Sequence, residues 1–93
     1  MKKIIEDNYR TIVDRGLIKP STTHNDFINK IYEEADELSL SYDYNDFENT
    51  KEELADVILT CLNMAKHFDI DIEQEIKNKI KINRYRAKNE KKT

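Results

Sequence analysis

The chain has 93 residues and 38% charged side chains, with one glycine and one proline, so we expect a single domain over residues 1–93 built from long helices. A chain of this length buries a small core. Its one cysteine excludes an internal disulfide framework and fits a reducing compartment. No apolar run approaches the roughly 18 residues of a membrane span, and the N-terminus lacks a signal-peptide pattern, which predicts a cytoplasmic protein.

The net charge of −3 is unevenly distributed. Residues 31–57 are strongly acidic, and residues 77–93 are basic and end in a basic tail from about residue 87. An acidic centre beside a basic segment is suited to hold a metal ion and a polyphosphate together. The basic segment is alternatively a solvated helix end, where cations favour the helix dipole. The negative net charge and the absence of a recognition motif disfavour a nucleic-acid partner.

The first expected helix covers about residues 3–15. Its thin apolar stripe indicates packing rather than chemistry and comprises Ile4, Ile5, Ile12 and Val13. Gly16 fits the position just after a helix end, and Pro20 prevents continuation.

The second expected helix begins near Thr23, where Thr23 and Asp26 have the spacing of a capping box. Glu34 falls beside its buried stripe and Glu37 further round the helix. The stripe comprises Phe27, Ile28, Ile31, Tyr32, Ala35 and Leu38.

Residues 41–49 show no clear period, which predicts a loop or a frayed helix end. Aromatic side chains in this stretch are candidates for stacking on a nucleobase or for covering the edge of the core: Tyr42, Tyr44 and Phe47. The chain has no tryptophan, so the sequence leaves the base-recognition pocket unplaced.

The third expected helix starts at Asn49 or Thr50, and we favour a capping box of Asn49 with Glu52. Its apolar stripe comprises Leu54, Val57, Ile58, Cys61, Leu62, Ala65 and Phe68. Cys61 is therefore expected to be a buried core thiol rather than a nucleophile. His67 is expected to act as a dipole partner near the helix end.

The fourth expected helix starts at about Asp71 with an apolar stripe of Ile72, Ile76 and Ile80. The stripe continues with Asn83 instead of an apolar residue, and Asn83 shares one side of the helix with Lys79 and Arg86. A polar residue on an apolar line indicates either a functional site or a helix that emerges into water.

Two pairs of carboxylates with three-residue spacing are the main chemical feature. Glu34 and Glu37 share one side of the second helix, and Glu53 and Asp56 share one side of the third. If the helices pack antiparallel, four carboxylates converge, and each pair of charges about 5 Å apart costs roughly 3 kcal/mol at an effective dielectric constant near 20. The groups are solvated and splayed, or some are protonated, or a hard cation lies among them. Oxygen ligands favour Mg²⁺ as that cation, with Mn²⁺ as a substitute.

These pairs resemble the metal-binding signature of the MazG-like nucleotide pyrophosphohydrolases. The flanking segments EEADEL, EELADVILTCLNMAKHFDIDIE and KNKIKINRYR are also similar to that family, over roughly residues 27–86. The resemblance implies an all-α, four-helix bundle that is completed as a homodimer or homotetramer. Asp36 departs from the family pattern at a position where a small residue is common, and Ala55 departs from it where glycine is common.

The resemblance also implies an activity: hydrolysis of a deoxy or non-standard nucleoside triphosphate to the monophosphate and pyrophosphate. It implies Mg²⁺ ligands at Glu34, Glu37, Glu53 and Asp56. Glu33 or one of those ligands would be the general base, and phosphates would be held by Lys79 and Asn83, with Arg86 as a weaker candidate. The alternative is a non-catalytic helical module that binds a nucleotide or a partner.

Overall fold

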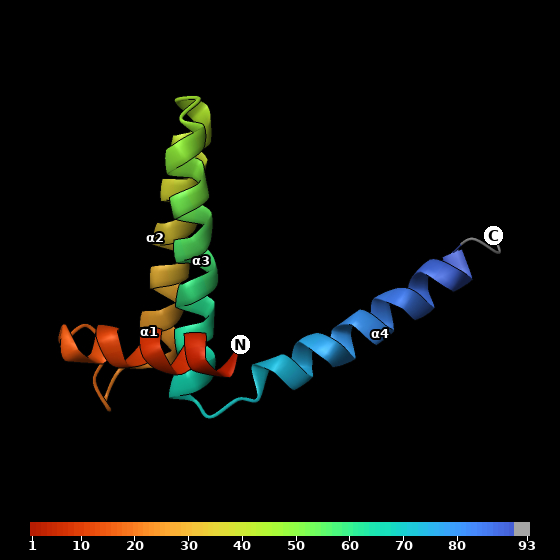
Figure 1. The fold of residues 1–93 in the computed structure, drawn as a ribbon, viewed down its shortest axis with the longest axis horizontal. Helices are drawn as coiled ribbons and strands as arrows, with labels where there is room; N and C mark the ends of the chain where they lie inside the picture. Colours follow the sequence, from red (N-terminus) through yellow and green to blue (C-terminus); the bar gives the residue numbers. More distant parts are fainter. Residues whose placement is uncertain (91–93) are drawn as a thin grey trace.

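The computed structural model describes residues 1–90 and contains four helices and no strand over that range. The helices are α1 (Lys2–Asp14), α2 (His24–Asp43), α3 (Phe47–His67) and α4 (Ile72–Glu90). Figure 1 shows α2 and α3 as a long antiparallel pair, with α1 lying across its open end and α4 extending away. The all-α class and the four predicted helices are confirmed.

The N-terminus of α2 is fixed by the predicted capping box. The Thr23 hydroxyl accepts a hydrogen bond from the Asp26 backbone N–H at 3.2 Å, and the Asp26 carboxylate accepts one from the Thr23 N–H at 2.8 Å. The hydrogen bond that the Asp26 carboxylate accepts from the Thr23 N–H is the largest cause that lowers the pKa of Asp26. Gly16 ends α1 as predicted, with a positive φ of 75° that suits a residue without a Cβ atom.

The turn between α2 and α3 is shorter than the sequence indicated. The predicted loop or frayed helix end over residues 41–49 is too long, because α2 continues to Asp43 and α3 begins at Phe47, which leaves only residues 44–46 outside the helices. The predicted Asn49–Glu52 capping box is also wrong. Asp46 is the N-cap, and its carboxylate accepts from the Asn49 N–H at 3.2 Å. Asn45 reverses the chain with φ 55°, a conformation that asparagine tolerates.

A small core lies where α1 crosses the α2–α3 pair. Its buried apolar residues are Ile18, Phe27, Leu62 and Ala65. His67 links three segments, since its Nε2 lies 2.9 Å from the Thr22 carbonyl oxygen and its Nδ1 lies 2.9 Å from the Tyr9 hydroxyl. Because the carbonyl only accepts, Nε2 is the donor and Nδ1 accepts from Tyr9 in the neutral ring. His67 therefore attaches α1 and the α1–α2 segment to α3, in addition to any effect on the helix dipole.

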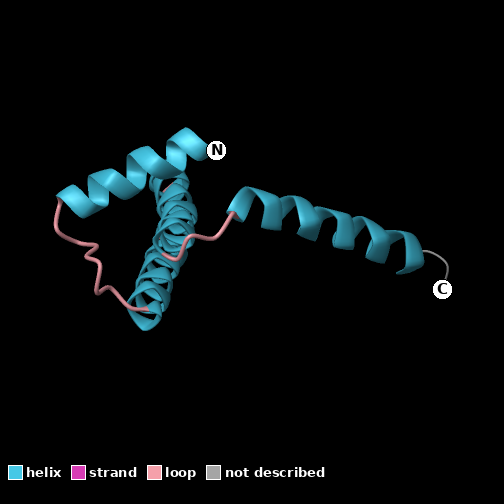
Figure 2. Ribbon diagram, turned by 90° about the horizontal axis from the view of Figure 1, so that it is seen from below, coloured by secondary structure: helices cyan, strands magenta, loops and turns pink. Residues whose placement is uncertain are grey.

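Much of the predicted apolar surface is not covered by the chain itself. Cys61 is exposed, so its prediction as a buried core thiol is wrong. The physical reason is that only one side of α3 packs against α2 and α1, while Leu54 and Ile58 on the other side are about half exposed. None of the residues of α4, Ile72–Glu90, is buried. Figure 2 shows that α4 leaves the body of the molecule after the short α3–α4 connection.

The basic tail predicted from about residue 87 falls partly in α4, which ends at Glu90, and residues 91–93 lie outside the described residues. None of the helices within residues 1–90 is long and apolar enough to cross a membrane.

The capping box generates a stability prediction. Thr23→Ala should lower the free energy of unfolding by about 1 kcal/mol, because it leaves an N–H at the start of α2 without its partner. Chemical denaturation followed by circular dichroism measures this change. Ser21→Ala, an exposed position outside the box, is the matched control. Equal stability of the two variants would contradict the role of the box.

Asp26 generates a pH prediction from the same box. Its pKa is lower in the folded protein than its ordinary value of 3.8, so its contribution is present above that value and is lost as the pH falls through the lower, folded pKa. The stability difference between the wild type and Asp26→Asn should therefore be larger at pH 7 than at pH 2. Denaturation at the two pH values checks this, and a difference that does not depend on pH would contradict it.

Candidate metal centre

The centre is built where the middle of α2 faces the N-terminal half of α3. Oxygen atoms of Glu34, Glu37 and Glu53 lie within 4.8 Å of one another. Glu34 and Glu37 come from successive turns of α2, and Glu53 comes from the facing turn of α3. The antiparallel pairing of α2 and α3 therefore brings together three of the four predicted ligands.

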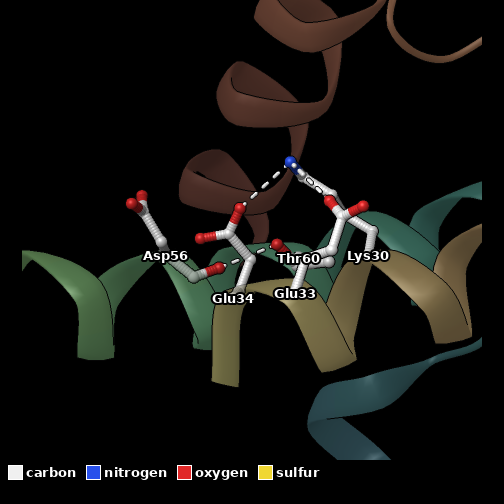
Figure 3. A network of polar contacts seen from close by, with 5 residues as sticks. All are labelled: Lys30, Glu33, Glu34, Asp56 and Thr60. Atoms are coloured by element: carbon white, nitrogen blue, oxygen red, sulfur yellow. Dashed lines mark hydrogen bonds and ion pairs between the residues drawn. The ribbon is translucent and has the colours of Figure 1, made fainter. Parts of the chain in front are cut away.

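The fourth predicted ligand, Asp56, stands next to this group rather than within it. Its side chain is exposed and is one turn further along α3 than Glu53. Figure 3 shows the Glu34 and Asp56 carboxylates projecting to the same side of the helix pair. Asp56 is held on a regular helix turn, since its backbone carbonyl accepts from the Thr60 hydroxyl at 2.8 Å. Glu34 and Asp56 line one cavity, whereas Glu37 and Glu53 line another.

The charges of the centre are incompletely compensated within the described residues. Glu34 is only 7% exposed, and its Oε1 lies 3.1 Å from the Lys30 ammonium, but its buried Oε2 has no hydrogen-bond partner there. The buried Oε2 of Glu53 also has none. Burial raises the pKa of Glu53, and the neighbouring carboxyls of Glu37, Asp56 and Glu34 raise it further. Two buried carboxylate oxygens without donors are suited to ligate a cation.

Several other predicted site residues lie outside this cluster. Glu33 is exposed, and its carboxylate lies 3.5 Å from the Lys30 ammonium, which also pairs with Glu34 (Figure 3). Lys79, Asn83 and Arg86 lie on α4, which packs extensively against neither α2 nor α3 over its described length. Within one chain the structure does not bring these three residues to the carboxylates, and their role stays a prediction.

Sequence reasoning missed Lys30 and Asn63. Lys30 is four residues before Glu34, a spacing that favours an ion pair on a helix. The hydrogen bond with Glu34 raises the pKa of Lys30. Asn63 is only 7% exposed and follows Asp56 by two helical turns. Asn63 is a polar residue on the buried side of α3, and this feature of the sequence could have marked it as a candidate site residue.

The structure is thus an all-α fold whose central helix pair carries an ExxE and an ExxD motif and gathers three of their four carboxylates in one cluster. A family model described as MazG-like matches residues 26–93, and the chain belongs to the MazG-like family. Comparison with curated proteins and with solved structures found no match. Family membership suggests a function of the nucleotide pyrophosphohydrolase type, and the family is typically metal-dependent. The match leaves out α1, the helix that packs across the open end of the pair.

The cluster generates a ligand-binding prediction. A saturating divalent cation should stabilise the folded protein by about 2.7 kcal/mol at one hundred times its dissociation constant. Glu53→Gln removes one of the converging charges, so it should raise the melting temperature in EDTA and abolish most of the stabilisation by Mg²⁺ or Mn²⁺. Thermal denaturation with each ion and with EDTA measures both effects.

Glu52→Gln is the matched control, because Glu52 is the exposed neighbour of Glu53 on the same helix. It should respond to the cations as the wild type does. An equal response of the two variants would show that the cluster does not bind the ion.

Proposed function

We propose that this protein is a Mg²⁺-dependent pyrophosphohydrolase that converts a nucleoside triphosphate into the monophosphate and pyrophosphate. The observation that carries the proposal is the group of Glu34, Glu37 and Glu53, with two buried oxygens that have no partner among the described residues. Membership of the MazG-like family supports the reaction class.

The carboxylate oxygens fit a hard cation, and Glu34, Glu37, Glu53 and Asp56 would hold it. When bound, Mg²⁺ would neutralise phosphate oxygens and activate water for attack. The protein's own groups bring the reactants together: the α2–α3 pair fixes the carboxylates, and Lys30 orients Glu34 through the 3.1 Å ion pair. Water adds to the α-phosphorus, the bond to the bridging oxygen breaks, and pyrophosphate leaves.

The proton of the attacking water needs an acceptor among the carboxylates of the site. Glu33, the three carboxylates of the cluster and Asp56 remain the candidates for the general base. Glu33 is exposed and shares Lys30 with Glu34, so it is free to move without breaking a core contact. Lys79, Asn83 and Arg86 are proposed to bind the phosphates and to compensate their charge in the transition state.

The activity is tested by pyrophosphate release from common and modified nucleoside triphosphates. We expect release with Mg²⁺ and none with EDTA. Glu53→Gln should reduce turnover by at least about a hundredfold, as expected when an electrostatic contact to the reacting group is lost. Glu52→Gln should leave turnover unchanged. Metal-dependent binding of nucleotide without turnover would instead support a non-catalytic nucleotide-binding module.

We further propose that the functional form is a homodimer at least. The accessible surface is 7586 Å², whereas a compact 11.1 kDa protein exposes about 5,700 Å². The radius of gyration is 16.1 Å, against about 12 Å for a compact chain of this length. The excess of about 1,900 Å² falls within the range of roughly 1,000–2,500 Å² that each subunit buries in an obligate dimer.

Exposed apolar side chains support a second copy as the occupant. They lie on α2, α3 and α4 and include Tyr32, Leu40, Leu54, Ile58, Ile76, Ile80, Ile82 and Tyr85. A second copy would cover them, and its α4 would then offer a source of the basic residues that one chain leaves far from the carboxylates.

The assembly is tested at α4. Ile80→Glu places a charge on the exposed apolar side of the helix, so it should shift the protein from dimer to monomer in light scattering coupled to size-exclusion chromatography. Ile80→Leu keeps the apolar surface and should remain dimeric. A wild-type protein that is monomeric at micromolar concentration would contradict the proposal.

A further inference from the structure

We propose that the cavity between α1, α2 and α3 binds the nucleoside part of the substrate, with the side-chain amides of Asn8 and Asn63 contacting the edge of the base. This inference rests on the proposed function, because it places the base relative to the same carboxylates. It uses α1, which the family match does not include.

The size and the position of the cavity support this assignment. Its volume is about 440 Å³, and Glu34 and Asp56 form part of its wall. Cavities of roughly 300–1,000 Å³ are typical of small-molecule sites. The cavity therefore opens onto the carboxylate cluster, and a ligand bound there can place a reacting phosphate beside the proposed metal ligands.

The length of the cavity also matches that of a nucleoside. Glu34 and Phe27 are seven residues apart on α2, and Asp56 and Asn63 are seven residues apart on α3. A rise of 1.5 Å per residue places the members of each pair about 10 Å apart along the helix axis. Because α2 and α3 are antiparallel, both intervals run in the same direction, from the carboxylates toward Phe27 and Asn63. This span is comparable with a nucleoside measured from its 5′ oxygen to the far edge of its base.

The lining offers the chemistry that a base requires. Its walls include five apolar side chains, of which Ile18 and Phe27 are buried: Ile12, Leu17, Ile18, Phe27 and Leu59. Asn8 Nδ2 donates to Asn63 Oδ1 at 2.9 Å. Within residues 1–90 neither amide makes another side-chain hydrogen bond, so the pair retains the carbonyl oxygen and one N–H of Asn8 and both side-chain N–H groups of Asn63. An adjacent acceptor and donor match the edge of a nucleobase, which presents a donor and an acceptor side by side.

The charge of the lining favours a neutral group over a phosphate. Two bases and three acids line the cavity: Arg15 and Lys30 against Asp26, Glu34 and Asp56. Lys30 is already paired with Glu34 at 3.1 Å. A polyphosphate in this space would meet net negative charge, whereas the uncharged base and sugar would not. The triphosphate is thus expected at the cluster, outside the cavity, with its charge compensated by the cation.

The test is calorimetric titration, in Mg²⁺, with the α,β-imido analogues of the four common deoxynucleoside triphosphates and with inorganic tripolyphosphate. Tripolyphosphate has the charge of the substrate without the nucleoside. We expect at least one analogue to bind roughly tenfold or more tightly than tripolyphosphate, as one or two added hydrogen bonds and the burial of a ring provide.

Asn63→Asp is the decisive variant. It keeps the oxygen that accepts from Asn8 and replaces the NH2 group, with both of its donors, by an oxygen, so the preference for that analogue over tripolyphosphate should fall by roughly tenfold. Asn29→Asp adds the same charge at an exposed position of α2 outside the cavity and should keep the preference. If Asn63→Asp does not fold, Asn8→Leu, at a half-exposed position of α1, tests the same pair.

An unchanged preference in the folded variants, or no preference in the wild type, overturns the assignment of the cavity. Hydrolysis of the unmodified triphosphates is measured in parallel and reports on the proposed function alone. A preference that depends on Asn63 without any hydrolysis supports the cavity and overturns the pyrophosphohydrolase. Hydrolysis without any preference for the nucleoside does the reverse.

Discussion

Repulsion among like charges is the constraint on which the rest of this structure depends. Glu34, Glu37 and Glu53 meet between two helices, and buried oxygens of Glu34 and Glu53 have no partner among the described residues. Such an arrangement destabilises the fold unless a cation or a proton compensates it. The free energy that holds the carboxylates together must come from the packing of α2 against α3 and from the core beneath α1. The carboxylate cluster thus lowers the stability of the fold in the absence of a compensating cation.

The elements around the pair hold it in place. The capping box at Thr23 and the N-cap at Asp46 fix where α2 and α3 begin, and these starting points set the registers of the acidic motifs. His67 connects α3 to Tyr9 and to the Thr22 carbonyl, which fixes α1 across the open end. Because α1 is fixed there, the space next to Glu34 and Asp56 is a walled cavity rather than an open surface. Packing at one end of the molecule thereby shapes the proposed substrate site at its middle.

The exposed apolar surface follows from the small number of helices that pack around α3. In a chain of 93 residues, one layer of helices on one side of α3 leaves the other side of α3 and all of α4 without cover. A larger single-chain bundle would bury these side chains internally. Here a second copy is proposed to do so, which explains why α4 remains amphipathic although it contacts little of its own chain.

Periodicity and spacing in the sequence determined the number and type of the helices, the capping box at Thr23, the end of α1 at Gly16 and the pairing of acids across two helices. These features depend on residues close together in the chain, so local rules suffice for them. The length of the turn between α2 and α3 was overestimated, because the aromatic and acidic residues there obscure the helical period at the end of α2 and at the start of α3. Cys61 was predicted to be buried because a periodic apolar face does not show whether its cover comes from the same chain.

Only the tertiary structure decided that Asp56 borders the cluster without joining it, that Lys30 pairs with Glu34, and that Asn8 meets Asn63 across 55 positions. Those outcomes depend on how α1, α2 and α3 cross in space, which is set by packing and not by any local pattern.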